Sequence, residues 1–118
     1  MELNSIMIGS AEPKRLRDYY AQVFGEPGFE QDGFSGWQLG NGFLAVGPHD
    51  EVSGTNPQPG RLIWNLETSD VRADFDRLKA AGATVVREPY NPGGAPEGLI
   101  ATFSDPDGNY FQLVSPMM

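Results

Sequence analysis

Residues 102–116, TFSDPDGNYFQLVSP, hold a turn between two short apolar runs. The turn at residues 105–109 has a proline that fixes φ, followed by Gly108 and Asn109, which adopt positive φ at little cost. Two apolar runs joined by such a turn predict a β-hairpin.

The predicted strand after this turn alternates in character. Because successive side chains of a strand point to opposite faces, its residues divide into two sets. One face holds Tyr110, Gln112 and Val114, and the other holds Phe111 and Leu113. The first face therefore carries a single polar group, Gln112, among apolar neighbours.

The first half of the chain begins with a predicted strand, residues 3–9, followed by a predicted helix. Ser10 is placed to cap this helix, and Gly25 stands where a left-handed residue ends many helices. Apolar residues at helical spacing predict one buried helix face. These residues are Leu16, Tyr19, Tyr20, Val23 and Phe24.

A turn-rich segment, residues 27–36, follows the helix. Residues 37–39 and 43–46 are predicted strands on either side of Gly40-Asn41-Gly42, which is a good hairpin signal. Residues 51–60 are rich in Gly, Pro and polar side chains and predict a linker.

The second half repeats this order of elements. We predict a strand at residues 61–68, a helix cap at Thr68 or Ser69, and a helix whose apolar residues Val71, Phe75 and Leu78 precede Gly82. A strand at residues 83–87 follows. A Pro/Gly-rich loop at residues 88–98, either a lid or a surface loop, leads to a strand at residues 99–103 and the opening hairpin.

Residue similarities support an internal repeat. When Ser5 is aligned with Ile63, the residues that alternate toward the buried face match in the two strands, and Trp64 lies under a helix. In addition, FLAVGP at residues 43–48 is similar to FQLVSP at residues 111–116. We therefore predict an α+β chain of two βαβββ modules, residues 1–50 and 61–118, joined by the linker at residues 51–60.

The segment SDPDGNYFQLV, residues 104–114, resembles the end of many proteins of the vicinal oxygen chelate (VOC) superfamily. This superfamily includes glyoxalase I, extradiol dioxygenases, and fosfomycin and bleomycin resistance proteins. The resemblance extends over nearly the whole chain. It implies a single VOC domain over residues 1–118, a mixed sheet whose uncovered faces form a cup, and a homodimer.

In metal-dependent members, the resemblance implies a divalent metal held at equivalent strand positions of both modules. Carried over to this chain, these positions are Ser5, Leu44, Ile63 and Gln112. Two of the side chains are apolar, serine is a poor ligand and glutamine offers one neutral oxygen, whereas stable divalent sites need several charged or imidazole donors. We therefore predict no metal and no cofactor at this site.

Apolar walls with a few neutral polar groups are typical of a ligand pocket. The alternative is that these side chains simply fill the interior. Trp37 is placed to stack on a planar ligand. The predicted pocket residues are Ser5, Met7, Trp37, Leu44, Val46, Ile63, Asn65, Tyr110 and Gln112.

Two titratable residues lie near predicted strand ends. Glu67 shares a face with Asn65 and Ile63 and is either a candidate general base or a surface residue at the rim. His49 is the single histidine and precedes two acidic residues. Neighbouring side chains of an extended segment do not converge on one ion, so we interpret His49 as a solvated turn residue.

The composition limits the possible partners. The chain has 118 residues and a net charge of −8. This charge disfavours a nucleic-acid partner, because phosphate binding needs clustered Lys and Arg. It suits a cationic ligand. The absence of cysteine excludes disulfide and thiolate chemistry. No segment has the roughly 20 apolar residues that span a membrane, and the N-terminus lacks signal-peptide features, so we expect a cytoplasmic protein.

Three functions fit these observations. The first is a metal-free small-molecule binding protein that sequesters a drug or metabolite, as the resemblance to bleomycin resistance proteins implies, with a planar or cationic ligand. The second is a glyoxalase-like lyase or isomerase, or a dioxygenase-related enzyme, with an atypical site. The third is a fold that serves only as a dimerisation or interaction module.

Overall fold

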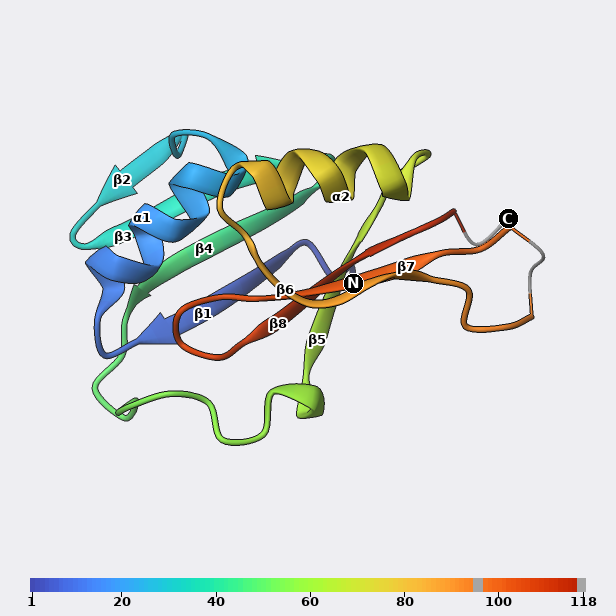
Figure 1. Cartoon of the computed structure of the whole chain (residues 1–118). Coiled ribbons are helices and arrows are strands. Elements are labelled where there is room, and N and C mark those ends of the chain that lie inside the picture. Colours follow the sequence, from blue (N-terminus) through green and yellow to red (C-terminus); the bar gives the residue numbers. More distant parts are fainter. Residues whose placement is uncertain (95–96, 117–118) are drawn as a thin grey trace. The chain divides into compact units, whose positions relative to one another are not determined.

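A computed structural model of the chain describes residues 1–94 and 97–116 (Figure 1). The chain forms two compact units, one of residues 1–54 and one that begins at residue 55. The boundary falls inside the segment predicted as a linker. Each unit has a four-stranded mixed sheet and one α-helix. The α+β class and the βαβββ order of both modules are therefore confirmed.

The first unit has the strand order β1-β4-β3-β2, in which β1 is parallel to β4 and the other pairs are antiparallel. The helix α1 lies across one face of this sheet (Figure 1). The elements of this unit are β1 (Ser5–Ser10), α1 (Pro13–Phe24), β2 (Phe29–Gln31), β3 (Phe34–Leu39) and β4 (Gly42–Pro48).

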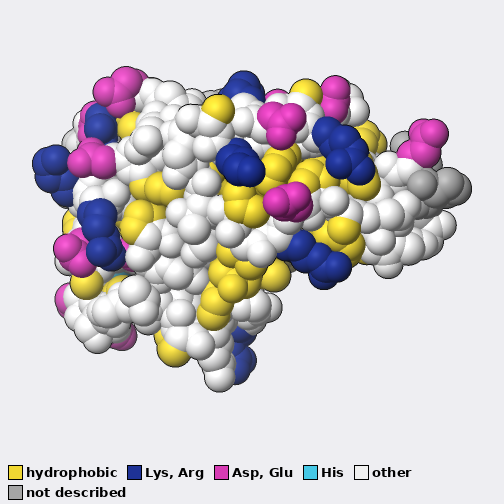
Figure 2. Space-filling model, in the orientation of Figure 1, with side chains coloured by type: hydrophobic (Ala, Val, Ile, Leu, Met, Phe, Trp, Pro, Cys, Tyr) yellow, Lys and Arg dark blue, Asp and Glu magenta, His cyan; other side chains and the backbone are white. Residues whose placement is uncertain are grey.

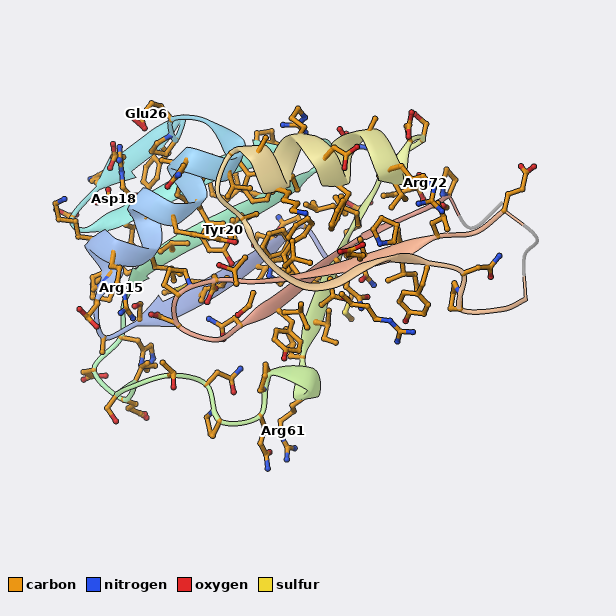
Figure 3. All side chains as sticks on the ribbon, viewed as in Figure 1. Arg15, Asp18, Tyr20, Glu26, Arg61 and Arg72 are labelled. Atoms are coloured by element: carbon orange, nitrogen blue, oxygen red, sulfur yellow. The ribbon has the colours of Figure 1, made fainter. Side chains whose placement is uncertain are left out.

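Aromatic rings form much of the core of the first unit. The ring of Tyr20, which is fully buried, lies 5.8 Å from the ring of Phe24 and 6.1 Å from that of Trp37. Figure 3 labels Tyr20 between α1 and the sheet. The buried residues of α1 are the predicted Leu16, Tyr19, Tyr20 and Val23, so the helical spacing identified the correct face.

The two ends of α1 differ in how well they were predicted. Glu12, and not Ser10, is the N-cap residue, while the Oγ of Ser10 accepts a hydrogen bond from the Glu12 N–H at 3.0 Å. The prediction for Ser10 was wrong because the helix begins later, at Pro13. Gly25 ends the helix as predicted, with a φ of 94° that favours glycine.

The segment predicted as turn-rich, residues 27–36, contains a further short hairpin. β2 pairs with β3 through a two-residue turn at Asp32 and Gly33, whose φ values are 54° and 84°. Asp-Gly with positive φ at both residues is a favoured hairpin turn. The signal was present in the sequence, but β2 is only three residues long and shows no alternation.

The second unit has the strand order β5-β8-β7-β6, in which β5 is parallel to β8. The helix α2 covers one face, and acidic and basic side chains are interspersed over it (Figure 2). The elements are the 3-10 turn η1 (Pro59–Arg61), β5 (Ile63–Glu67), α2 (Val71–Ala80), β6 (Thr84–Tyr90), β7 (Ile100–Ser104) and β8 (Tyr110–Val114).

A series of stacked rings fills the core of the second unit. The ring centroids of Phe75 of α2 and Phe103 are 5.4 Å apart, and those of Phe103 and Phe111 are also 5.4 Å apart. The ring centroids of Phe111 and Trp64 are 5.1 Å apart. All four side chains are 7% exposed or less. The alternation predicted for β8 and the place of Trp64 under a helix are confirmed.

The cap of α2 is Asp70, so the prediction of Thr68 or Ser69 was wrong. The Asp70 carboxylate accepts a hydrogen bond from the Ala73 N–H at 3.0 Å, and the Oγ1 of Thr68 accepts one from the Asp70 N–H at 3.2 Å. A carboxylate at this place also interacts favourably with the helix dipole. The helix ends before Gly82, as predicted.

The predicted turn at residues 105–109 is organised by a buried carboxylate. Asp105 is 4% exposed, and its Oδ1 accepts hydrogen bonds from the N–H groups of Asp107 at 2.9 Å and Asn109 at 3.0 Å. Gly108 has the predicted positive φ of 83°, whereas Asn109 does not. The one glycine is sufficient because the Asp105 side chain holds the rest of the turn.

The strand β6 is longer than predicted and ends at Tyr90, which pairs with Ile100. The first residues of the predicted loop at residues 88–98 are therefore part of the sheet, and residues 95–96 of that loop lie outside the described residues. In the described part of the chain, no helix is long and apolar enough to span a membrane.

Candidate functional site

Each sheet has a face covered by its helix and an opposite face, which we call the open face. In the first unit, β1 pairs with β4 through Ser5↔Phe43 and Met7↔Ala45. These four residues share the open face, because partners on neighbouring strands point to the same side. Met7 is 52% exposed. Ser5 and Met7 therefore lie on the face opposite the helix.

Three other predicted pocket residues lie on the helix-covered face. The register pairs Leu44 with both Ile6 and Trp37, and Val46 follows two residues later on the same side. Trp37 is 3% exposed, and its Nε1 donates a hydrogen bond to the Gly25 carbonyl at 2.7 Å. The prediction that Trp37, Leu44 and Val46 share a face with Ser5 and Met7 was wrong.

The error is a slip of one residue in the internal repeat. Ser5 pairs with Phe43, and Ile63 pairs with Tyr110. If Ser5 corresponds to Ile63, Phe43 corresponds to Tyr110, not to Phe111, and Ala45 corresponds to Gln112. A shift of one residue exchanges the two faces of a strand, which moved Leu44 to the wrong side.

Two phenylalanine rings on the open face of the first unit were missed from the sequence. A Cβ atom added to Gly47 would overlap the ring of Phe34, and one added to Gly36 would overlap the ring of Phe43. Each ring therefore lies directly against the backbone of a glycine on a neighbouring strand. The alternating Gly and Phe residues of β3 and β4 were the signal, because glycine within a strand often marks such a close approach.

A row of polar side chains crosses the open face of the second unit. The register aligns Asn65 of β5 with Gln112 of β8, Gln112 with Thr102 of β7, and Thr102 with Arg87 of β6. The Nε2 of Gln112 donates a hydrogen bond to the Oγ1 of Thr102 at 3.0 Å. We call these four residues the polar row. Thr102 and Arg87 were not predicted from the sequence.

Apolar side chains border the centre of the polar row on both sides, with Ser104 beside Tyr110 and Glu67 beside Val114. Ile63 pairs with Tyr110 on one side, and Val114 pairs with Ile100 on the other. All four are half-buried. The sequence placed Ile63, Asn65, Tyr110 and Gln112 on one face, and the register brings them together there.

The two titratable candidates lie at strand ends. Glu67 is exposed at the end of β5, on the open face, where it pairs with Val114. His49 is exposed after β4, and its Nδ1 accepts a hydrogen bond from the Glu51 N–H at 3.1 Å. This local bond agrees with the interpretation of His49 as a turn residue.

The donor set does not fit the divalent metal that the superfamily resemblance implies. Ser5, Ile63 and Gln112 lie on open faces, and Ala45 stands at the position assigned to Leu44 from the sequence. These side chains offer one hydroxyl and one amide, with no carboxylate or imidazole. Within residues 1–94 and 97–116, no group of three or more His, Cys, Asp or Glu side chains is gathered closely enough to hold a metal ion.

The first unit also has a concavity of about 560 Å³ between α1 and the β2–β3 hairpin. At its wall, Arg17 donates two hydrogen bonds of 3.1 Å to the Glu30 carboxylate and also contacts Asp18 and Glu26, the last two labelled in Figure 3. The Glu30 carboxylate raises the pKa of Arg17 above its ordinary value. Because Arg17 of α1 holds Glu30 of the hairpin through two hydrogen bonds, we interpret the cluster as an anchor of the hairpin on α1.

Comparison with protein families identifies the class of this protein. The model of the Glyoxalase-like domain matches residues 5–114, and the chain belongs to this family, within the VOC superfamily. No curated protein matches the sequence.

Solved structures of the same superfamily have the same fold. A glyoxalase/bleomycin resistance protein/dioxygenase family enzyme from Burkholderia phytofirmans PsJN is 21% identical, with 98% of each chain covered and a TM-score of 0.71. A member of this superfamily from Sphaerobacter thermophilus DSM 20745 is 23% identical, with 98% of each chain covered and a TM-score of 0.72.

A third similar structure has a higher identity. TnmS3, an antibiotic binding protein from Streptomyces sp. CB03234, is 26% identical, with 98% of this chain and 96% of that chain covered and a TM-score of 0.68.

Proposed function

We propose that this protein binds a small, planar organic molecule on the open face of the second unit without the help of a metal ion. The observation that carries the proposal is the polar row of the second unit, bordered on both sides by half-buried apolar side chains. Few polar groups among apolar and aromatic neighbours are the usual composition of a small-molecule site. A donor set without carboxylate or imidazole supports binding without metal.

Two further observations support this proposal. The rings of Phe34 and Phe43 lie against glycines on the open face of the first unit, so that face also has apolar aromatic surface. TnmS3, which is similar to this chain over nearly its full length, is an antibiotic binding protein. Sequestration of a drug or metabolite is therefore the biological role that we propose, in a homodimer as the superfamily resemblance implies.

Binding can be tested by titrating ¹⁵N-labelled protein with a panel of planar aromatic compounds and recording amide spectra. We expect at least one compound to shift the side-chain amide signals of Asn65 and Gln112, and Gln112→Leu to weaken its binding by about tenfold, which is the effect of one lost hydrogen bond at a desolvated site. Gln22→Leu, an equivalent change on the exposed side of α1, should bind as the unaltered protein does. Shifts confined to other regions, or equal binding by Gln112→Leu, would contradict the proposal.

A further inference from the structure

Arg87 is the one basic residue in any strand of the described residues. It lies on the edge strand β6, paired with Thr102 at the end of the polar row. The chain has 16 acidic and 8 basic residues, so its net charge is negative. Arg87 nevertheless places a positive charge on the open face of this sheet. The local charge of this face therefore differs from the net charge of the protein.

The first of two register shifts in β6 brings Arg87 to this face. Val85 pairs with Phe103 on the helix-covered face, and the register shifts before Arg87 pairs with Thr102. Without this shift, Arg87 would lie on the same face as Val85, because residues two apart in a regular strand share a side. Bulges commonly redirect a side chain near a functional site.

The second register shift adds an aromatic support. It lies between Arg87 and Tyr90, which are three residues apart, and Tyr90 pairs with Ile100 on the open face. The guanidinium carbon of Arg87 lies 3.4 Å from the centroid of the Tyr90 ring. Stacking of this kind orders the guanidinium while its N–H donors, which point along the plane of the group, remain available.

The guanidinium has no carboxylate partner among the described residues. This contrasts with Arg17, which is held by Asp18, Glu26 and Glu30. The carboxylate of Glu67 is on the same open face but on β5, at the other edge of the sheet. Strand spacings of about 4.8 Å place β5 and β6 about 14 Å apart, too far for an ion pair across the sheet.

We infer that the ligand is a planar organic acid whose carboxylate binds to Arg87, while its uncharged part lies along Thr102, Gln112 and Asn65. This inference rests on the proposed function and names the ligand class. The flat fork of a guanidinium matches the two oxygens of a carboxylate. A single arginine in an acidic protein suits a monoanion and not a phosphate dianion. The row of about 14 Å is long enough for a molecule of two fused or linked rings.

The test compares two probes of nearly equal shape, 2-naphthoate and 2-naphthamide, by isothermal titration calorimetry and by amide spectra of the labelled protein. We expect the unaltered protein to bind the acid about tenfold more tightly than the amide, the usual gain of a charge-assisted hydrogen bond. This preference should disappear in Arg87→Gln. Tyr90→Leu should reduce it without abolishing it.

Arg72→Gln is the matched control, because Arg72 is exposed on α2 and the substitution changes the net charge equally (Figure 3). It should keep the preference for the acid. Equal affinity for both probes in the unaltered protein, or a preference that survives Arg87→Gln, overturns the inference and leaves the proposed function standing if Asn65 and Gln112 still shift. No binding of either probe or of the aromatic panel overturns both. Tighter binding of naphthyl phosphate than of naphthoate overturns the carboxylate assignment.

Discussion

The Nε2 of Gln112 donates a hydrogen bond of 3.0 Å to the Oγ1 of Thr102 across the β7–β8 ladder. Thr102 is 6% exposed and Gln112 is half-buried. The bond lies in surroundings where water does not fully replace a lost partner. It also fixes the amide at the centre of the polar row.

Removing either member of this pair should destabilise the protein. We expect Thr102→Val to lower the free energy of unfolding by about 1–2 kcal/mol, because the amide of Gln112 loses its partner. The double variant Thr102→Val/Gln112→Leu should lose less unfolding free energy than the sum of the two single variants, by about 0.5–1 kcal/mol. The reason is that either single change already removes the same hydrogen bond. Urea unfolding of the four proteins measures this coupling, and strictly additive losses would show that the bond contributes nothing.

The contact between Phe43 and Gly36 predicts a steric effect. Gly36→Ala should destabilise the first unit by about 1–3 kcal/mol, because the new Cβ overlaps the ring and forces it to move. Gly28→Ala is the control, since a Cβ at Gly28 meets no atom within 4 Å. It should change stability by less than about 0.5 kcal/mol. Equal effects of the two changes in thermal unfolding would show that the ring does not lie against Gly36.

Trp37 provides a test of the corrected face assignment. Trp37→Phe removes the hydrogen bond from Nε1 to the Gly25 carbonyl and should cost about 1–2 kcal/mol of unfolding free energy. Its affinity for 2-naphthoate should stay within about twofold of the unaltered protein, because a side chain on the helix-covered face does not touch a ligand on the open face. An unchanged stability together with a large loss of affinity would return Trp37 to the ligand site.

The sequence was most informative where local chemistry determines structure. The turn at residues 105–109, the end of α1 at Gly25 and the alternation of β8 followed from proline, glycine and the two-residue period. The face of β4 did not, because Phe43, Leu44 and Val46 are all apolar and alternation between Leu44 and Ala45 does not show which one lies under the helix. Only the pairing of β4 with β1 decides this.

The place of Arg87 could not be predicted for a related reason. A regular strand would direct Arg87 to the side of Val85, and the sequence TVVREPY has no glycine to mark the register shifts of β6. The polar row depends on contacts between residues far apart in the chain, from Asn65 to Gln112. Patterns within one segment therefore identified Gln112 and Asn65 but missed their neighbours Thr102 and Arg87.

The ion pairs of α1 predict how stability depends on pH. Hydrogen bonds from Arg17 lower the pKa of Glu30 below its ordinary value of 4.5, and those from Lys14 lower the pKa of Asp18 below 3.8. A carboxyl group with a lower pKa in the folded state stabilises the fold above its unfolded pKa, and this contribution is lost as the pH falls through the folded pKa. We therefore expect stability to decrease as the pH falls below about 4.5.

Two substitutions separate this effect from general acid unfolding. At pH values below about 4.5, the urea midpoint of Glu30→Gln should depend less on pH than that of the unaltered protein, because glutamine does not titrate. Glu51→Gln, at an exposed carboxylate in the segment after β4, should keep the full dependence. An identical pH profile for both variants would show that the Arg17 cluster does not contribute.

The most direct test of the metal-free account is the metal content of the purified protein, together with thermal unfolding in the presence of Ni²⁺, Zn²⁺, Mn²⁺ or Fe²⁺. The same measurements are made on His49→Ala, a variant that lacks the exposed turn histidine. A metal bound only to the folded state would raise the melting temperature as its concentration increases. We expect no stoichiometric metal and no such rise in His49→Ala. A stoichiometric metal in both proteins, with a melting temperature that rises with metal concentration, would contradict the account.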